Sequence, residues 1–262
     1  MGSASRTALG AGVAALAAAK GVTLATGEEL LAAARAIDGS AQLRALLSDP
    51  TLGAKDREGL VAKAFASLGA SAKELLGGLA TSRWSNAAQL VDGVEEIGIR
   101  AIAQAEQRAD IVAELFAVER AVSSDAELEL ALGSKLASSE AKAAVVTRLL
   151  ARQGSPATVA IVRHLVQSPR GRRIGALLRR AAQIVADVAG GVVATVTVAA
   201  PLSAEQQRAL TADIAERFGK EPRIQVITDP AVLGGVRVRV GDTVIDGTVA
   251  SRLADLRLQL AG

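Results

Sequence analysis

Apolar residues recur at spacings of three and four from the N-terminus to about Gly190, among strong helix formers such as Ala, Leu, Glu and Arg. This pattern predicts a series of amphipathic helices. Ser71-Ala-Lys-Glu74 and Ser124-Asp-Ala-Glu127 both fit the capping box that opens a helix. Ser155 precedes Pro156, which suits a capping residue followed by a first-turn proline. We expect Ser168-Pro169 to end one helix and open the next.

The helical part contains an internal repeat. The segment 29–37, Glu-Leu-Leu-Ala-Ala-Ala-Arg-Ala-Ile, corresponds to 114–122, Glu-Leu-Phe-Ala-Val-Glu-Arg-Ala-Val, at an offset of 85 in the numbering. Further matches, with shifts of one residue along the way, are Leu43/Leu128, Leu47/Leu132, Val61/Val145, Phe65/Leu149, Ser71/Ser155, Leu79/Leu165 and Ser82/Ser168. Matches in this order predict a duplicated helical unit. The alternative is two Ala-rich stretches whose apolar positions coincide in phase.

The pattern changes after Gly190-Gly191. Val192–Ala199 is β-branched and alternating, which predicts a strand, and Arg223–Thr228 predicts a second one. Between them, the capping box Ser203-Ala-Glu-Gln206 opens a helix that Gly219 is placed to end.

A hairpin and a last helix complete the C-terminal part. The run 236–245 reads Val-Arg-Val-Arg-Val, then Gly-Asp, then Thr-Val-Ile, and Gly-Asp suits a two-residue turn. Arg237 and Arg239 lie on the face opposite the valines. Thr248 can cap a helix lined by Leu253, Leu256 and Leu260. The predicted fold is therefore mainly α: an N-terminal helical bundle, duplicated, followed by a small C-terminal α/β domain with a β-hairpin.

Composition removes most common enzyme chemistries. The 262 residues include no Cys, no Tyr and one His, and their formal net charge is only +3. Disulfides, thiolate nucleophiles and Cys-based metal sites are therefore excluded, and His-based metal sites or relays are disfavoured. The longest apolar run, Ala8–Ala19, is shorter than the roughly 18 to 20 residues of a spanning helix. We interpret it as an N-terminal helix rather than a signal peptide.

The candidate chemical residues have simpler interpretations. Gly10-Ala-Gly12 resembles part of a dinucleotide fingerprint, but no strand precedes it. The pair Glu95-Glu96 and the pair Glu127/Glu129 lie in charged helical stretches, which favours a solvated face over a catalytic pair. His164 is expected to be a partly buried or surface histidine. We therefore predict no catalytic residue, no cofactor-binding residue, no metal ligand and no cofactor.

Two blocks of opposite charge remain. The stretch from Asp92 to Glu129 has ten acidic residues, and Arg163–Arg180 has six arginines and no acid. The basic block could contact phosphates, so a helical nucleic-acid-binding adaptor is the alternative function. Because this stretch contains no aromatic residue and no recognised nucleic-acid module is visible, a solvated or subunit-facing helix is favoured. Opposite blocks also suit the steering of protein partners.

The C-terminal residues resemble a known family. Ala200-Pro-Leu-Ser-Ala-Glu-Gln-Gln207 and, above all, the run 234–247, Gly-Gly-Val-Arg-Val-Arg-Val-Gly-Asp-Thr-Val-Ile-Asp-Gly, are similar to the delta subunit of the bacterial F-type ATP synthase. Its mitochondrial counterpart is the oligomycin sensitivity-conferring protein. The resemblance covers roughly residue 109 to the C-terminus. Ser82-Arg-Trp84 and the long N-terminal half look similar to the extended delta subunits of actinobacteria.

The resemblance implies a non-catalytic peripheral-stalk (stator) subunit of the proton-translocating synthase. A helical bundle would bind the N-terminal helices of the alpha subunits on the catalytic head. The α/β domain would bind the b-type stalk subunits, and Arg237, Arg239 and the terminal helix are candidate contacts. The implied location is the cytoplasmic side of the cell membrane, peripherally, with no direct membrane span, no nucleic-acid partner and no active site on this chain.

An ordinary member of the family has one helical unit, whereas this chain is predicted to have two. The predicted domains are an extra helical unit at 1–103, the usual alpha-binding unit at 104–189, and the α/β domain at 190–262. The role of the extra unit stays open: it could dock on the head, lengthen the stalk or pack on the second unit.

Overall fold

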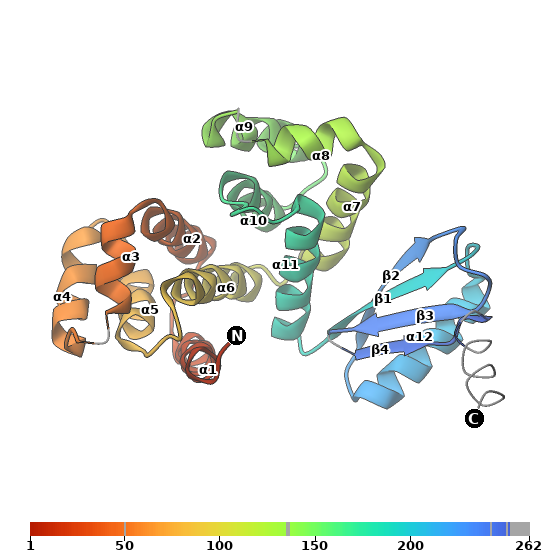
Figure 1. Ribbon diagram of the computed structural model, residues 1–262, viewed down its shortest axis with the longest axis horizontal. Helices are drawn as coiled ribbons and strands as arrows, with labels where there is room; N and C mark the ends of the chain where they lie inside the picture. The colour runs from red at the N-terminus through yellow and green to blue at the C-terminus, as the bar shows by residue number, and fades with distance from the viewer. Residues whose placement is uncertain (50, 135–136, 242, 250, 252–262) are drawn as a thin grey trace, which may run out of the picture. The chain divides into compact units, whose positions relative to one another are not determined.

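The computed structural model describes residues 1–262 except 50, 135–136, 242, 250 and 252–262. It forms two compact units, Met1–Val185 and Ala186–Gly262. The first unit is helical, and the second contains a four-stranded sheet (Figure 1). The predicted fold class, mainly α with a small C-terminal α/β domain, is therefore confirmed. Among the described residues, no helix has both the length and the apolarity required to span a membrane.

The helical unit contains both predicted helical segments. Its helices are α1 Ser3–Ala18, α2 Leu24–Gly39, α3 Ala41–Ser48, α4 Ala54–Ala64, α5 Ala70–Thr81, α6 Ala87–Ala105, α7 Ile111–Ser124, α8 Ala126–Gly133, α9 Ser139–Leu150, α10 Pro156–Gln167 and α11 Ile174–Val188. Helices α10 and α9 pack together, as do α2 and α6, and α10 also contacts α2 and α6.

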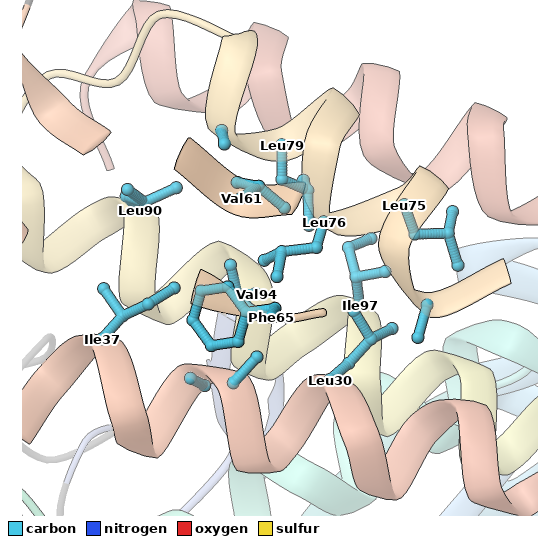
Figure 2. Close-up of a cluster of buried hydrophobic side chains, with 14 of the residues drawn as sticks. Leu30, Ile37, Val61, Phe65, Leu75, Leu76, Leu79, Leu90, Val94 and Ile97 are labelled. Atoms are coloured by element: carbon cyan, nitrogen blue, oxygen red, sulfur yellow. The ribbon is translucent and has the colours of Figure 1, made fainter. Parts of the chain in front are cut away.

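The N-terminal helices enclose a tightly filled core. Figure 2 shows Phe65, which follows α4, among leucines, isoleucines and valines of α2, α5 and α6. At the crossing of α2 and α6, a Cβ on Gly27 would lie 2.8 Å from the backbone oxygen of Gly98. Glycine at this position allows the two helix backbones to approach closely. Helix α6 is buried along much of its length, including Glu95 and Glu96.

The predicted helix starts were partly right. Ser155 caps α10, accepting the Thr158 N–H at 3.2 Å, and Pro156 lies in the first turn as predicted. The capping boxes at Ser71 and Ser124 were wrong: α5 begins after Gly69, and the carboxylate of Asp125 caps α8. Asp125 rather than Ser124 is the N-cap because its side chain accepts hydrogen bonds from two backbone N–H groups at once.

The end of α10 matches the prediction, but the next helix begins later than expected. Ser168 follows the last residue of α10, as predicted. Helix α11 begins only at Ile174, after a loop in which Arg170 and Gly171 have positive φ angles of 48° and 75°. Arg170 and Arg172 of this loop contact Glu95 of α6.

Helices α2–α6 and α7–α11 follow one another in a similar pattern of lengths and connections. One hydrogen bond also recurs. The N–H of Gly69, before α5, donates to Glu29 on α2 at 2.9 Å, and the N–H of Ser155, before α10, donates to Glu114 on α7 at 2.9 Å. The two glutamates are related by an offset of 85 in the numbering, and the two donors by an offset of 86. These paired features support the proposed duplication of a helical unit.

The offset between the two halves stays at 85 through α4 and α9. Val61 is buried, and so is Val146, whereas Val145 is exposed. The match of Val61 with Val145, and with it that of Phe65 with Leu149, was therefore shifted by one residue. The physical reason is that Ala54 and Ser139, the first residues of α4 and α9, are related by this same offset, so the buried faces align there.

The second unit is an α/β domain. Its elements are β1 Val192–Val198, α12 Ala204–Phe218, β2 Pro222–Thr228, β3 Val236–Val240 and β4 Thr243–Asp246. The sheet order is β2-β1-β3-β4, with β1 and β2 parallel and the other pairs antiparallel. Helix α12 connects β1 to β2 and packs on the sheet through Ile214 (Figure 1).

Local signals predicted this unit well. The capping box at Ser203, the left-handed C-cap at Gly219 and the β3–β4 hairpin are all confirmed. The hydroxyl of Thr248 accepts the Ser251 N–H at 3.3 Å, in keeping with a helix cap. The remainder of the predicted terminal helix, with its three leucines, lies outside the described residues.

Candidate functional site

An apolar groove opens between α7, α8, α9 and α10. Its volume is about 470 Å³. We define the apolar groove by Ala117, Val118, Val122, Leu128, Leu132, Val146, Leu149, Leu150 and Val162. Leu149 stands at its edge with 58% of its surface exposed, whereas Val122 and Val146 are buried. The groove thus combines a buried apolar floor with an exposed apolar edge.

Several side chains of the groove differ from their counterparts in the N-terminal half. The corresponding positions of the N-terminal half hold bulkier or more apolar groups at offsets of 85 and 86. These pairs are Ile37/Val122, Phe65/Leu150, Leu68/Gln153 and Leu76/Val162. In the N-terminal half these side chains belong to the filled core or pack against it (Figure 2). The lining of the groove is thus smaller or more polar at these positions, whereas Ala33/Val118 and Ala64/Leu149 differ in the opposite sense.

A buried charged cluster joins the two helical halves. Glu95 of α6 receives hydrogen bonds from three side chains beyond α9: the Nε2 of His164 at 3.1 Å, Arg170 at 2.8 Å and Arg172 at 3.2 Å. On its other ring nitrogen, Nδ1, His164 accepts a hydrogen bond from Arg35 of α2 at 2.8 Å. Glu95 and His164 are both buried. The cluster therefore links α2 and α6 to α10 and the loop after it.

A second buried carboxylate lies beside the first on α6. Glu96 pairs with Arg100 one turn later at 3.0 Å, and with Arg180 of α11 at 3.1 Å. On α7, Glu119 pairs with Arg179 of α11. Arg180 therefore connects α11 to α6, and the preceding Arg179 connects it to α7.

The electrostatics of the cluster favour an ionised Glu95 and a neutral His164. Burial acts to raise the pKa of Glu95. The hydrogen bond from His164 and the charges of Arg170 and Arg172 outweigh it, so the pKa falls from 4.5 to about 2. Burial lowers the pKa of His164 below its usual value of 6.5, and Arg35 and Arg170 act in the same direction.

Three sequence interpretations are corrected here. Glu95 and Glu96 do not form a solvated face, because they are buried and ion-paired. His164 is fully buried rather than partly buried or at the surface. Four of the six arginines of the basic block pair with carboxylates of the acidic block inside the chain, rather than facing only solvent or another subunit. The signal for this was present: two blocks of opposite sign are separated by a stretch with few charges of either kind.

The α/β unit exposes apolar side chains beside its hairpin. Leu233 is 68% exposed, and Val244 and Val249 are also exposed. Gly234 and Gly235 have positive φ angles of 74° and 82°, and the backbone oxygen of Gly234 accepts the Val249 N–H. Arg237 donates to Asp246 across the hairpin at 2.8 Å. Arg237 is therefore already paired within the chain.

Within the described part of the chain, no group of three or more His, Cys, Asp or Glu side chains is arranged to hold a metal ion. The carboxylate that contacts His164, that of Glu95, is also engaged by arginines. The geometry described above thus comprises an apolar groove and an internal ionic contact.

A family model described as the ATP synthase delta (OSCP) subunit matches residues 99–260. The chain belongs to this family. The ATP synthase subunit delta of Leifsonia xyli subsp. xyli is 50% identical over 264 residues and covers 100% of both chains. That of Streptomyces griseus subsp. griseus is 39% identical over 240 residues, covering 90% of this chain and 89% of the relative. The family resemblance predicted from the sequence is confirmed.

The alignments with both relatives extend well into the N-terminal half, which the family model does not match. The long form of the subunit is thus shared with these two actinobacterial proteins. Among solved structures, a chain of the Toxoplasma gondii mitochondrial ATP synthase hexamer aligns with a TM-score of 0.42 and 24% identity, covering 64% of this chain and 95% of that chain.

Proposed function

We propose that the chain is a non-catalytic stator subunit of the F-type proton-translocating ATP synthase. In this proposal the second helical unit, 104–189, binds an N-terminal helix of an alpha subunit. The α/β domain, 190–262, binds the end of the b-type stalk subunits. The chain would then lie peripherally at the cytoplasmic side of the cell membrane, holding the catalytic head against the torque of the rotor.

The apolar groove is the observation that carries the proposal. Amphipathic helices bind by laying apolar side chains at spacings of three, four and seven into such a groove. A volume of about 470 Å³ accommodates several such side chains. The groove lies within residues 99–260, the part that the family model matches. The filled core at the same positions of the N-terminal half supports the assignment of alpha binding to the second unit.

The α/β unit supports a separate binding surface. Leu233 and Val249 are exposed apolar residues, and the Val249 N–H donates to Gly234 beside Leu233; exposed apolar side chains in one place favour a protein contact over solvent. A tether must hold the head and the stalk at once, so the two partners require surfaces on different units. We therefore assign the b-type contact to the region of Leu233.

The test is a titration of the full chain with a synthetic peptide of the alpha subunit's N-terminal helix, followed by calorimetry. Leu149→Asp should weaken binding at least tenfold, since it removes an apolar contact and places a carboxylate where water is excluded. Leu46→Asp is the matched control, because Leu46 is a similarly exposed leucine, 42% exposed, in the N-terminal half. The control should bind with unchanged affinity.

Trp84 gives an independent readout, since it is the only Trp of the chain. Its Nε1 donates to the backbone oxygen of Leu79 at 2.7 Å within the N-terminal half. If the peptide occupies the apolar groove, Trp84 emission should stay constant. A change at Trp84, with no effect of Leu149→Asp, would move the site to the N-terminal half. Absence of binding by a competent peptide would remove the proposed alpha contact.

A second variant separates the two partners. Leu233→Asp should weaken binding of a soluble C-terminal segment of the b subunit and leave binding of the alpha peptide unchanged. Leu149→Asp should do the reverse. If either variant lost binding of both the alpha peptide and the b segment, the proposal of separate binding surfaces would be contradicted.

The absence of catalysis is also part of the proposal. The isolated chain should hydrolyse no ATP, and sustained hydrolysis by rigorously purified protein would contradict a purely structural role. The alternative function, nucleic-acid binding by Arg163–Arg180, gains no support from the geometry. Four of its six arginines, Arg170, Arg172, Arg179 and Arg180, are paired with carboxylates of α6 or α7.

A further inference from the structure

The buried contact between the two helical halves contains the only histidine of the chain. His164 of α10 lies between Arg35 of α2 and Glu95 of α6, with its side chain almost entirely removed from solvent. None of these three residues lines the apolar groove. The proposed stator function leaves this group unexplained.

The protonation state of His164 follows from its two partners. Arginine is a donor only, so Nδ1 must accept the hydrogen bond from Arg35 and carries no proton. The other ring nitrogen, Nε2, therefore bears the hydrogen and donates it to Glu95. The imidazole is neutral, and it bridges a cation on α2 to an anion on α6.

A second proton on this ring has no place in the observed arrangement. It would have to go on Nδ1, where it would end the hydrogen bond from Arg35 and set two cationic donors face to face at 2.8 Å. The ring of His164 is buried, so the added charge would be only weakly hydrated. The lowered pKa of His164 has the same origin in burial, with Arg35 and Arg170 contributing.

The surrounding charges offset this cost only in part: the hydrogen bond to Glu95 and the charge of Glu95 act to raise the pKa of His164, but burial outweighs them. Glu95 already accepts from Arg170 and Arg172, and Asp92 pairs with Arg170 at 2.8 Å. Arg163 of α10 and Glu28 of α2 lie near Arg35. Glu95, with its pKa of about 2, stays ionised throughout mildly acidic conditions. In that range the imidazole is the group of this contact whose charge changes.

We propose that Arg35, His164 and Glu95 form an acid-sensitive latch, closed by the neutral imidazole, that holds the N-terminal helical half against α10. On protonation of His164 the latch opens, and the two halves separate about the connection 106–110 between α6 and α7. The pair of Arg180 and Glu96 contains no histidine and resists the separation, so the open form is a second population beside the closed one.

Because the chain has no Cys and a single His, introduced cysteines can be labelled specifically and the imidazole signal can be assigned to His164. Spin labels on Lys63→Cys, in α4, and Arg152→Cys, after α9, report the distance between the two halves, and both positions are exposed. We expect one narrow distance distribution at pH 7.5 and a second, longer distance at pH 5. A single unchanged distribution at pH 5 would overturn the proposal.

His164→Gln is the matched variant. A glutamine side chain can accept from Arg35 through its oxygen and donate to Glu95 through its nitrogen, yet it takes up no proton in this pH range. The second distance should therefore be lost in His164→Gln at pH 5. If the variant opens at the same pH as the parent, other groups open the contact and the latch is refuted.

A direct measurement needs no variant and guards against a misfolded His164→Gln. In the full chain labelled with ¹⁵N-histidine, the single imidazole gives one pair of nitrogen signals. We expect the neutral tautomer with hydrogen on Nε2 at pH 7.5, and protonation only well below pH 6.5, together with the appearance of the longer distance. A charged ring or hydrogen on Nδ1 at pH 7.5 would overturn the proposal.

Discussion

Glu95→Gln tests how strongly the buried ionic contact stabilises the helical unit. The substitution keeps the volume of the side chain, removes its charge, and leaves Arg170 and Arg172 with Asp92 as the carboxylate that they still share. Removal of one partner of a buried ion pair typically costs about 3 to 5 kcal/mol, because the remaining charge is buried without compensation. The two arginine side chains are 15% and 30% exposed and can regain part of their hydration. We therefore expect a loss of about 3 kcal/mol, at the lower end of that range.

The assay is urea unfolding at pH 7.5, followed by far-ultraviolet circular dichroism and by Trp84 emission. The free energy of unfolding should fall while the slope with urea stays constant. Asp38→Asn is the control, since Asp38 forms a partly exposed pair with Arg44 at 3.3 Å. Such surface pairs contribute about 0.2 to 1 kcal/mol. A loss in Glu95→Gln no larger than that of the control would refute the reasoning.

Three further predictions concern packing and pH. Gly27→Ala places a Cβ 2.8 Å from the backbone oxygen of Gly98 and should lower the free energy of unfolding in urea by about 1 to 3 kcal/mol. Gly77→Ala has open space around the new Cβ and should instead raise it by about 0.5 to 1 kcal/mol. Equal effects of the two substitutions would contradict the close approach of α2 and α6. Phe65→Ala removes the ring at the centre of the core in Figure 2 and should lower the free energy of unfolding by about 3 to 5 kcal/mol in the same assay. A loss below about 1 kcal/mol would show that the ring is not packed as described. The low pKa of Glu95 contributes stability above pH 4.5 that is lost as the pH falls toward 2. The urea midpoint should therefore drop less steeply over this pH range in Glu95→Gln than in the parent. Parallel plots of urea midpoint against pH would contradict this.

Elements with strong local signals could be predicted from the sequence. The hairpin around Gly241 and the proline after Ser155 depend on the backbone preferences of adjacent residues, and the structure confirms both. The start of α5 could not be predicted in this way. The helix begins directly after Gly69, whose N–H donates to Glu29, a residue 40 positions earlier in the chain.

The candidate sites depend on tertiary packing and were harder to predict. Glu95 and His164 are 69 residues apart, and each alone has the sequence context of an ordinary helical residue. The apolar groove depends on small differences in volume, such as Leu150 in place of Phe65, which matter only once both halves are aligned by their helices. Hydrophobic periodicity gives the face of a helix that is buried, but not whether the space against that face is filled.

The contact between the two helical halves raises the question of why it includes a buried ionic cluster. Burying charges contributes little net stability compared with apolar groups of the same shape. An apolar contact, however, tolerates small slips between helices, because leucine and valine faces pack in several ways. The contact of Glu95 with His164, Arg170 and Arg172 satisfies its donors and acceptors in one arrangement only. We infer that the contact fixes the orientation of the extra unit, which a subunit resisting torque requires more than it requires additional stability.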